Sequence, residues 1–241
     1  MWEFLLTLLC GFLGICREPT HCRDIQYAQV EHIVCSFRAD EVSVRVHLND
    51  ETGRPYARLS SLKGVLSTDP LMLMNGGMYH DDLSPVGLYV EAGEKAQSLS
   101  TKDGWGNFHL LPNGVFWVKN GRASVTETRA FARRKIRPDM ATQSGPMLVI
   151  DGKLHPRFLK DSDSLKIRNG VGVSKDGSML HFAISRRPIN FWNFGHLFQR
   201  ELKAHNALFL DGTVSSIQAD GFSQSGWKSI GPIISVLPKN G

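Results

Sequence analysis

The stretch Ala207-Leu208-Phe209-Leu210-Asp211-Gly212-Thr213-Val214-Ser215-Ser216 joins a short apolar run directly to a polar turn. The run is typical of a buried strand, so the carboxylate of Asp211 stands at the end of that strand. A carboxylate is costly to leave in a core, so one placed there is either satisfied by its neighbours or used for chemistry. Both interpretations stay open at this point: hydrogen bonds from its own turn, or a reaction.

Two further segments share this design, in which an apolar strand runs into a polar turn with glycine. They are Leu73-Met74-Asn75-Gly76-Gly77-Met78-Tyr79 and Ala141-Thr142-Gln143-Ser144-Gly145-Pro146. Loops at strand ends on a rigid scaffold are where binding and catalytic residues gather. Paired glycines let a backbone approach a ligand closely and expose N–H groups, and a plain turn is the alternative interpretation.

The pattern along the rest of the chain predicts many short strands and few helices. Alternating apolar and polar residues predict that 27–37 and 41–48 are paired strands. Further strands are predicted over 71–74, 85–91, 114–119, 146–150, 179–184, 207–210 and 230–237, and helices over 58–66, 126–137 and 194–205. Tight turns are predicted at Asn113-Gly114, Asn120-Gly121, Asp151-Gly152 and Asp176-Gly177. Without a regular βαβ rhythm, this predicts an α+β fold: a single domain of mixed β-sheets with a few packed helices.

Length and charge narrow the class of protein. With 241 residues, 41% of them hydrophobic, the chain is long enough for one well-buried core. Lys and Arg number 28 against 23 for Asp and Glu, a modest surplus that favours anionic substrates without indicating nucleic acid. The residues most suggestive of a basic patch are Arg129, Arg133, Arg134, Lys135 and Arg137, which we interpret as a solvated basic face.

The N-terminus predicts export to the periplasm or the medium. An apolar run of about a dozen residues suits a secretory leader over residues 1–21 and is too short to span a bilayer comfortably, so no stable membrane span is expected in the mature domain, 22–241. Against export, Glu3 is the only charged residue of the segment before that run. Lipid attachment at Cys16 is the alternative.

The four cysteines stand at positions 10, 16, 22 and 35. Once a leader is removed, Cys22 and Cys35 remain as a pair that an oxidising compartment would convert to a disulfide. Two buried thiols in a reducing compartment are the alternative. Neither cysteine has the spacing of a zinc site.

Four motifs, in order, resemble those of the phosphodiester glycosidase family. They are Asn75-Gly76-Gly77-Met78-Tyr79, then Gln143-Ser144-Gly145-Pro146-Met147-Leu148 with Asp151-Gly152, then Arg168-Asn169-Gly170-Val171-Gly172, and 207–212 with Ser215-Ser216. The resemblance runs from about Cys22 to the C-terminus. It implies a hydrolase that cleaves a glycosyl phosphodiester, and the segments 107–108 and 112–116 resemble a bacterial exported subgroup linked to cell-surface or exopolysaccharide glycans.

The resemblance also implies roles for individual residues. Asp211 would supply the reactive carboxylate, and Arg168 would bind the phosphate, because a guanidinium offers a planar fork to phosphate oxygens. Asn75 and Gln143 would position sugar hydroxyls or water. The remaining substrate-binding residues predicted are Gly76, Gly77 and Gly145, through their backbone N–H groups, and Tyr79, Ser144, Asn169, Gly212, Ser215 and Ser216.

Each assignment has an alternative. Arg168 would form a surface ion pair with Asp161 or Asp163, and the amides and serines would be ordinary turn and strand residues. Thr213 and Val214 stand where the family often has small residues, which favours a tighter pocket or a non-catalytic carbohydrate-binding or scaffold protein. In that second class of protein, Trp105, Trp117, Trp192 and Trp227 would stack on sugar rings, the alternative being burial in the core.

No cofactor is required by these motifs. His80-Asp81-Asp82 would hold a divalent cation such as calcium through its carboxylates, or form a solvated loop. The chain lacks the His-Glu-x-x-His pattern of zinc hydrolases and the Gly-x-Ser-x-Gly turn of serine hydrolases.

Overall fold

A computed structural model describes residues 21–239, apart from the side chain of Thr213. The leader predicted for residues 1–21 and the lipid attachment predicted at Cys16 therefore fall outside the described residues, His21 excepted. Within residues 21–239, no helix is both long enough and apolar enough to cross a membrane.

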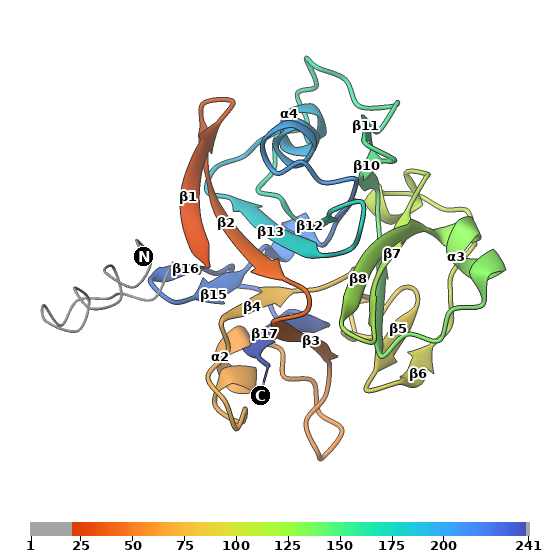
Figure 1. Cartoon of the computed structure of the whole chain (residues 1–241), viewed down its shortest axis with the longest axis vertical. Helices are drawn as coiled ribbons and strands as arrows, with labels where there is room; N and C mark the ends of the chain where they lie inside the picture. The colour runs from red at the N-terminus through yellow and green to blue at the C-terminus, as the bar shows by residue number, and fades with distance from the viewer. Residues whose placement is uncertain (1–20, 240–241) are drawn as a thin grey trace, which may run out of the picture.

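Residues 21–239 form three antiparallel sheets (Figure 1). The first has seven strands in the order β1 (Cys22–Tyr27), β2 (Val30–Arg38), β13 (Met179–Ser185), β12 (Asn169–Val173), β14 (Asn206–Phe209), β10 (Met147–Ile150) and β11 (Lys153–Leu154). The second has the order β16 (Phe222–Gln224), β15 (Ile217–Ala219), β4 (Met72–Asn75), β17 (Ile233–Pro238) and β3 (Val42–His47). The third has the order β6 (Glu94–Gln97), β5 (Tyr89–Glu91), β9 (Met140–Ser144), β7 (Gly114–Lys119) and β8 (Arg122–Glu127).

Few helices accompany the sheets. They are α2 (Leu59–Lys63), α3 (Thr128–Arg134), α4 (Phe191–His196), which continues into a π-helical turn η2 (Leu197–Glu201), and the 3-10 turns η1 (Asn107–His109) and η3 (Gly212–Val214). Strands hold 41% and helices 13% of the described residues, so the structure is mostly β and the predicted α+β class is met only roughly.

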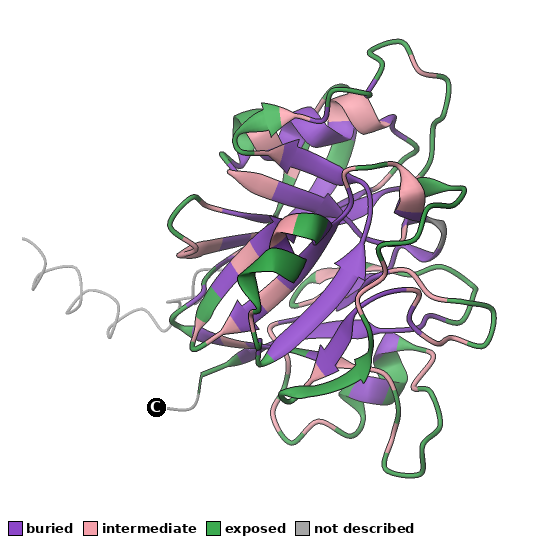
Figure 2. Ribbon diagram, turned by 90° about the vertical axis from the view of Figure 1, so that its right-hand side faces the viewer, coloured by how far each residue is buried: buried purple, intermediate pink, exposed green. Residues whose placement is uncertain are grey.

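The main apolar core lies where the three sheets face one another. Ile33, Met72, Phe116 and Val171, one or more from each sheet, belong to one buried cluster. Figure 2 shows the central strands buried, whereas edge strands such as β1 and β6 and many of the connections are largely exposed. The other face of the seven-stranded sheet is covered by α4 and η2, whose Phe194 and Phe198 pack with residues of β2 and β13 (Figure 1). Polar residues at the strand ends therefore lie at the border of this core.

Several predicted elements are confirmed. The strand predicted over 114–119 is β7, and the helix predicted over 58–66 is the shorter α2. Asn120 and Gly121, with φ of 51° and 71°, form the predicted tight turn between β7 and β8, since both angles lie in the region that hairpin turns require. The helix predicted over 194–205 begins earlier, at Phe191, because the side chain of Asn190 accepts a hydrogen bond from the Asn193 N–H and caps it.

The predicted pairing of 27–37 with 41–48 is wrong. β2 pairs with β1 and β13, whereas β3 pairs with β17 in another sheet. The chain turns at Ala28 and Gln29, which have φ of 49° and 61°. Neither Ala nor Gln is typical of a turn, so the sequence pattern gave no indication that the chain turns here.

The disulfide predicted between Cys22 and Cys35 is present. The two residues are register partners across β1 and β2, so the bond closes the open end of this hairpin. A disulfide is consistent with export, because reducing compartments keep thiols reduced.

Candidate active site

The side chain of Asn75 joins three of the four predicted motifs. Asn75 ends β4 and is 1% exposed. Its Nδ2 donates to the backbone carbonyl oxygen of Asp211 at 2.9 Å. Its Oδ1 accepts from Asn169 Nδ2 and from the backbone N–H of Ser216, both at 2.8 Å. One buried amide therefore fixes Asp211, Asn169 and Ser216 around itself.

The sheet register explains why these residues meet. The ladder between β12 and β14 pairs Gly170 with Phe209, and Leu210 N–H then donates to the Asn169 carbonyl at 3.1 Å. Continued by one step, this register brings the backbones of Arg168 and Asp211 opposite each other. In the neighbouring sheet, Asn75 N–H donates to the Ser216 carbonyl at 3.2 Å. Polar residues at the ends of two different sheets are thus brought into one place.

Asp211 is half-buried, and its charge acts on the hydroxyl of Tyr79. Burial, and then the negative charge of Asp211, raise the pKa of the Tyr79 hydroxyl above its ordinary value. That hydroxyl donates to the carbonyl oxygen of Ser229 at 2.7 Å. Gly212 follows in η3, and the hydroxyl of Ser215 donates back to its carbonyl at 3.0 Å, which stiffens the turn after the carboxylate.

Arg168 is almost fully buried, with 1% of its surface exposed. Its Nε donates to the Ile189 carbonyl at 2.7 Å, a terminal N–H donates to the Ser164 carbonyl at 2.8 Å, and the guanidinium lies 3.5 Å from the ring centre of Phe191. Burial lowers the pKa of Arg168 to about 10, so it remains charged near neutral pH. The alternative of a surface ion pair with Asp161 or Asp163 is wrong, because the side chain points into the protein.

The backbone N–H groups expected to face a ligand at Gly76 and Gly77 are engaged within the protein. Gly76 N–H donates to the Pro232 carbonyl at 2.7 Å, and Gly77 N–H donates to Thr142 Oγ1 at 3.2 Å. A Cβ added to Gly77 would overlap the carbonyl oxygen of Gln143. Gly76 therefore packs closely on Pro232 and Gly77 on β9, and our expectation of exposed N–H groups there is wrong.

Gln143 is also occupied within the protein. Its Oε1 accepts from the N–H groups of Leu88 and Ser100, both at 2.9 Å, and its Nε2 donates to the Ser100 carbonyl at 2.7 Å and to Thr128 Oγ1 at 3.1 Å. An amide has two donors and two acceptor positions, so none is left for a sugar hydroxyl. Gln143 holds the segment after β6 in place instead of binding substrate directly. Nothing in the sequence pointed to Ser100 or Thr128.

Two predicted site residues carry buried polar atoms that have no hydrogen-bond partner. In the described part of the chain, three side chains have such an atom: His32 Nε2, Ser144 Oγ and Asn169 Oδ1. A buried polar atom without a hydrogen-bond partner is unfavourable and rare, so each of these three atoms needs an explanation, and binding of a ligand is one explanation. Gly145 follows Ser144, and a Cβ there would lie 2.6 Å from that of Asn113, which only glycine avoids.

The loop His80-Asp81-Asp82 is exposed. Asp82 accepts a hydrogen bond from the Ser84 N–H at 2.9 Å, and bonds from Ser84 lower the pKa of this carboxyl. Within residues 21–239, no three His, Cys, Asp or Glu side chains gather as a metal site would require. Calcium binding at this loop stays a prediction.

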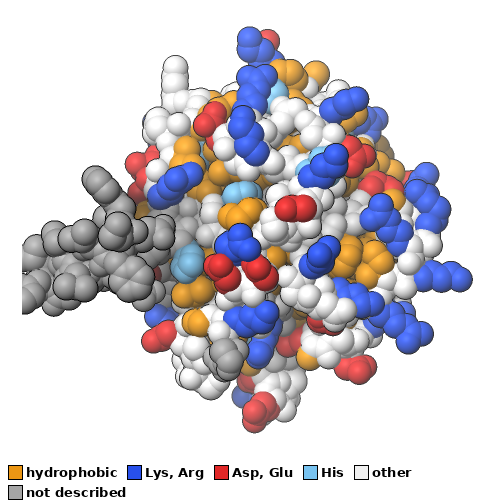
Figure 3. All heavy atoms as spheres, viewed as in Figure 1, with side chains coloured by type: hydrophobic (Ala, Val, Ile, Leu, Met, Phe, Trp, Pro, Cys, Tyr) orange, Lys and Arg blue, Asp and Glu red, His pale blue; other side chains and the backbone are white. Residues whose placement is uncertain are grey.

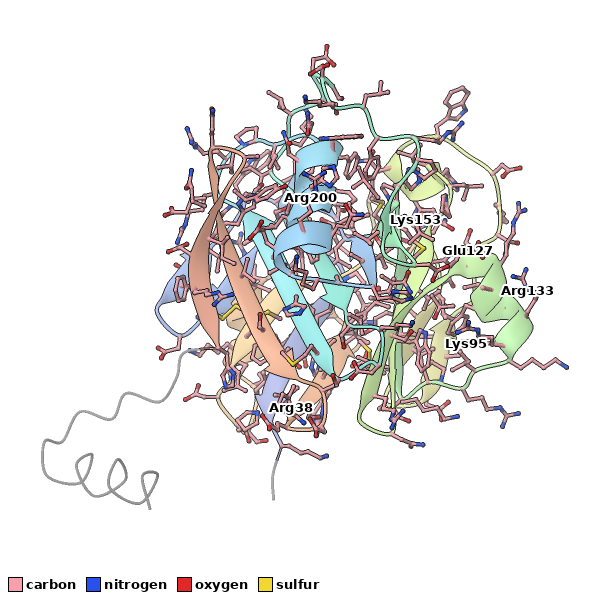
Figure 4. All side chains as sticks on the ribbon, turned by 45° about the horizontal axis from the view of Figure 1, so that its top comes forward. Arg38, Lys95, Glu127, Arg133, Lys153 and Arg200 are labelled. Carbon is pink, nitrogen blue, oxygen red and sulfur yellow. A yellow bond between two sulfur atoms is a disulfide. The ribbon has the colours of Figure 1, made fainter. Side chains whose placement is uncertain are left out.

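The basic residues near α3 form a solvated face. Arg129, Arg133, Arg134, Lys135 and Arg137 are all exposed. Lys and Arg side chains gather over α3 at the edge of the molecule (Figure 3), and the labelled Arg133 extends outward from that helix (Figure 4).

Comparison with known proteins assigns the family. The sequence profile of the phosphodiester glycosidase family matches residues 69–221, which include all four motifs. The uncharacterized protein YigE of Escherichia coli strain K12 is 34% identical to this chain over 180 residues, which cover 74% of this chain and 70% of YigE. The chain belongs to the phosphodiester glycosidase family, and this membership suggests phosphodiester glycosidase activity.

Two solved structures share the fold. The catalytic domain of zebrafish N-acetylglucosamine-1-phosphodiester alpha-N-acetylglucosaminidase, auto-inhibited by its pro-peptide, superposes with a TM-score of 0.64 at 13% identity, over 93% of this chain and 86% of that one. A hypothetical protein from Synechocystis superposes with a TM-score of 0.57 at 13% identity, over 90% of this chain and 61% of that one. At such identity the likeness concerns the fold alone.

Proposed function

We propose that this protein is an exported hydrolase that cleaves a glycosyl phosphodiester, with Asp211 as its reactive carboxylate. The observation that carries the proposal is the amide of Asn75, which bonds to Asp211, Asn169 and Ser216 at once. Three motifs far apart in the sequence thereby converge on the backbone of the residue that carries this carboxylate. Membership of the phosphodiester glycosidase family supplies the reaction class.

The reaction breaks the bond between the anomeric carbon and a phosphate oxygen, and the oxygen of water ends on that carbon. The departing phosphate monoester is a weak base, so it leaves without the strong general acid that ordinary glycosidases need. Asp211 attacks the anomeric carbon or takes the proton of the attacking water. Its half-buried position keeps it at the border of the core, where a sugar can reach it.

Arg168 supplies positive charge for the phosphate. The partners that hold its guanidinium are two carbonyl oxygens and an aromatic ring, none of which carries a negative charge. A guanidinium has five N–H donors, so donors beyond the two bonds to Ile189 and Ser164 are available to phosphate oxygens. Because the side chain is buried, direct contact requires the Ser164 segment, with its exposed neighbour Leu165, to move.

A cell-surface or exopolysaccharide glycan is the substrate class that fits an exported enzyme. The Cys22–Cys35 disulfide and the apolar N-terminal run support export. The net charge of +5 favours an anionic polymer over a neutral one.

The test is release of free sugar from a panel of sugar-1-phosphodiesters by the native chain and by Asp211→Asn. We expect the substitution to lower kcat by about 10²- to 10⁴-fold, because it removes a charge from the reacting centre. Asp69→Asn is the matched control, since the Asp69 side chain is 93% exposed. Repeating the assay with EDTA and with added calcium tests the cation predicted at His80-Asp81-Asp82.

The outcomes separate the two classes of protein. Equal turnover by the native chain and Asp211→Asn would remove Asp211 from the chemistry. No turnover by the native chain across the panel, together with glycan binding that survives Asp211→Asn, would support a non-catalytic carbohydrate-binding or scaffold protein. Equal thermal melting of both chains shows that a lost activity does not come from unfolding.

A further inference from the structure

Two of the four tryptophans expected to stack on sugars are almost fully exposed. Trp105 is 98% exposed and Trp227 is 84% exposed, whereas Trp117 and Trp192 are half-buried. Trp117 donates from its ring N–H to Thr126 and packs on Phe131, so it belongs to the fold. Burial in the core, the alternative for all four, is therefore wrong for Trp105 and Trp227. Tryptophan is enriched at interfaces, so rings left in water on loops that are anchored next to the candidate site are candidates for contact with a ligand.

Trp227 stands on a loop, 225–232, that is bonded directly to the candidate active site. Gly226 N–H donates to Ser216 Oγ at 3.2 Å, and the Ser229 carbonyl accepts from the Tyr79 hydroxyl at 2.7 Å. These bonds lie one residue before Trp227 and two residues after it, so the ring is carried by the same groups that surround Asp211. Beside it, Lys228 Nζ lies 5.3 Å from the centre of the Trp227 ring.

Trp105 stands on a second loop, 98–113, that is bonded to Gln143 at the end of β9. The amide of Gln143 makes two hydrogen bonds with the backbone of Ser100, at 2.9 and 2.7 Å. A Cβ added to Gly145 would lie 2.8 Å from the carbonyl oxygen of Phe108, so this loop also packs on the strand end at Gly145.

Close contacts connect the anchors of the two loops. Gln143 is next to Thr142, and the Thr142 hydroxyl accepts a hydrogen bond from the Gly77 N–H. Gly77 lies two residues after Asn75, and the Asn75 amide oxygen accepts a hydrogen bond from the Ser216 N–H. The 98–113 loop is fixed at one end of this series and the 225–232 loop at the other. Each loop also borders a hollow: one of about 170 Å³ lined by Arg58, Ser216 and Lys228, and one of about 260 Å³ lined by Lys102 and Arg129.

We propose that Trp105 and Trp227 are sugar-stacking subsites that flank the reaction centre, so that the substrate is an extended anionic glycan and not an isolated sugar phosphodiester. This inference rests on the proposed function and adds to it the length and charge of the substrate. The flat face of an indole ring matches the C–H face of a pyranose. Lys102, Arg129, Arg58 and Lys228 place positive charge next to each ring's loop, which suits the phosphates of a repeating glycosyl phosphodiester.

The test compares two substrates of the same unit: the methyl phosphodiester of N-acetylglucosamine 1-phosphate, and an oligomer of N-acetylglucosamine linked through 1-phosphodiesters. The quantity measured is the ratio of kcat/KM for the oligomer to kcat/KM for the methyl diester. We expect Trp105→Ala and Trp227→Ala each to lower this ratio about 2- to 10-fold, and the corresponding Tyr variants to restore part of it, because an aromatic face is kept. Val65→Ala is the control, since Val65 is an exposed apolar residue, 64% exposed, away from both loops in sequence.

A ratio unchanged in both Ala variants overturns the inference while the proposed function stands. Failure of the native chain to cleave these two substrates and every member of the panel of sugar-1-phosphodiesters defeats the proposed function instead. In that case, oligomer binding measured by calorimetry decides the inference: equal affinity of the native chain and the Ala variants overturns it, and weaker affinity of the variants supports it. A change in the sedimentation of the protein alone on Trp227→Ala also overturns it, because the ring would then cover a contact between copies of the chain.

Discussion

The side-chain amide of Asn75 holds the backbone carbonyl of Asp211 at 2.9 Å, although the two residues are 136 positions apart in the sequence. Asn75 ends β4 in one sheet, and Asp211 follows β14 in another. The position of the candidate reactive carboxylate is therefore set by how two sheets pack. A substitution of Asn75 is expected to move the Asp211 carboxylate although Asp211 itself is unchanged.

Replacing Asn75 with Ala is expected to lower both stability and activity. Three buried partners, the Asp211 carbonyl, the Asn169 amide and the Ser216 N–H, would lose their hydrogen bonds. Leaving such groups unsatisfied costs on the order of 1–3 kcal/mol in the free energy of unfolding. Urea unfolding measures this cost, and Asn49→Ala, on an exposed residue, is the matched control.

The variant Asn75→Asp separates the two effects. It keeps an oxygen that accepts from Asn169 and Ser216 but replaces the donor to the Asp211 carbonyl with a second acceptor. For a given loss of stability, we expect Asn75→Asp to lose more activity than Asn75→Ala, because its carboxylate repels the backbone carbonyl oxygen of Asp211. Activity of Asn75→Asp equal to that of the native chain would show that the Asn75–Asp211 bond does not position the carboxylate.

Gly77 and Gly64 form a matched pair for the effect of adding one methyl group. A Cβ at Gly77 would overlap the Gln143 carbonyl and approach Thr142 Oγ1, whereas at Gly64 its closest neighbour is 3.6 Å away, at the end of α2. Gly77→Ala is expected to cost about 1–3 kcal/mol of stability by overpacking. Gly64→Ala is expected to be neutral or stabilising, because it restricts the unfolded chain. Thermal melting of both variants checks this, and equal melting temperatures would contradict the tight contact between β4 and β9.

Arg168→Lys and Arg168→Met distinguish a role of charge from a role of packing. Lys keeps the charge and loses the stacking on Phe191, whereas Met fills much of the volume and loses the charge. If the charge acts on the phosphate, Met lowers kcat/KM for a phosphodiester by about 10²- to 10³-fold and Lys by less. If the kcat/KM of each variant follows its stability, and Arg168→Lys is no more active than Arg168→Met, Arg168 has a packing role only.

The fold was predictable from sequence where each strand has a buried face and ends at a recognisable turn. β7 was located because Asn120-Gly121 marks the hairpin that follows it. Pairing between sheets was not predictable in this way: β3 has the same alternation as β2 but lies in the other sheet, and Ala28-Gln29 turns the chain with ordinary residues.

The candidate site shows the same division. Motifs at strand ends pointed to Asp211, Asn75 and Asn169, because polar groups there are otherwise unfavourable. The roles of Gln143 and Arg168 depend on partners that no local pattern reveals. Ser100, which makes two of the hydrogen bonds of the Gln143 amide, lies 43 residues away. The ring of Phe191 covers the guanidinium of Arg168, which the sequence would place equally well on the surface.

Stability is expected to fall as the pH is lowered from 7 toward 4, because two histidines are held neutral in the fold. Burial, assisted by Arg45 and Arg23 respectively, lowers the pKa of His47 and of His181 from 6.5 to about 4. Glu91 Oε1 lies 3.9 Å from His47 Nδ1 and favours the protonated imidazole, but burial is the larger effect on the pKa of His47. At a pH between the folded and the unfolded pKa of a histidine, the unfolded chain binds more protons than the folded one. The free energy of unfolding therefore decreases as the pH is lowered, by up to about 1.4 kcal/mol per pH unit for each histidine. Urea unfolding at pH 7, 6 and 5, chosen within this window, measures the slope, and His181→Gln should remove part of it, because burial also lowers the pKa of His32, His155 and His196. A free energy of unfolding that stays constant from pH 7 to pH 5 would show that neither imidazole is kept from protonation by the fold.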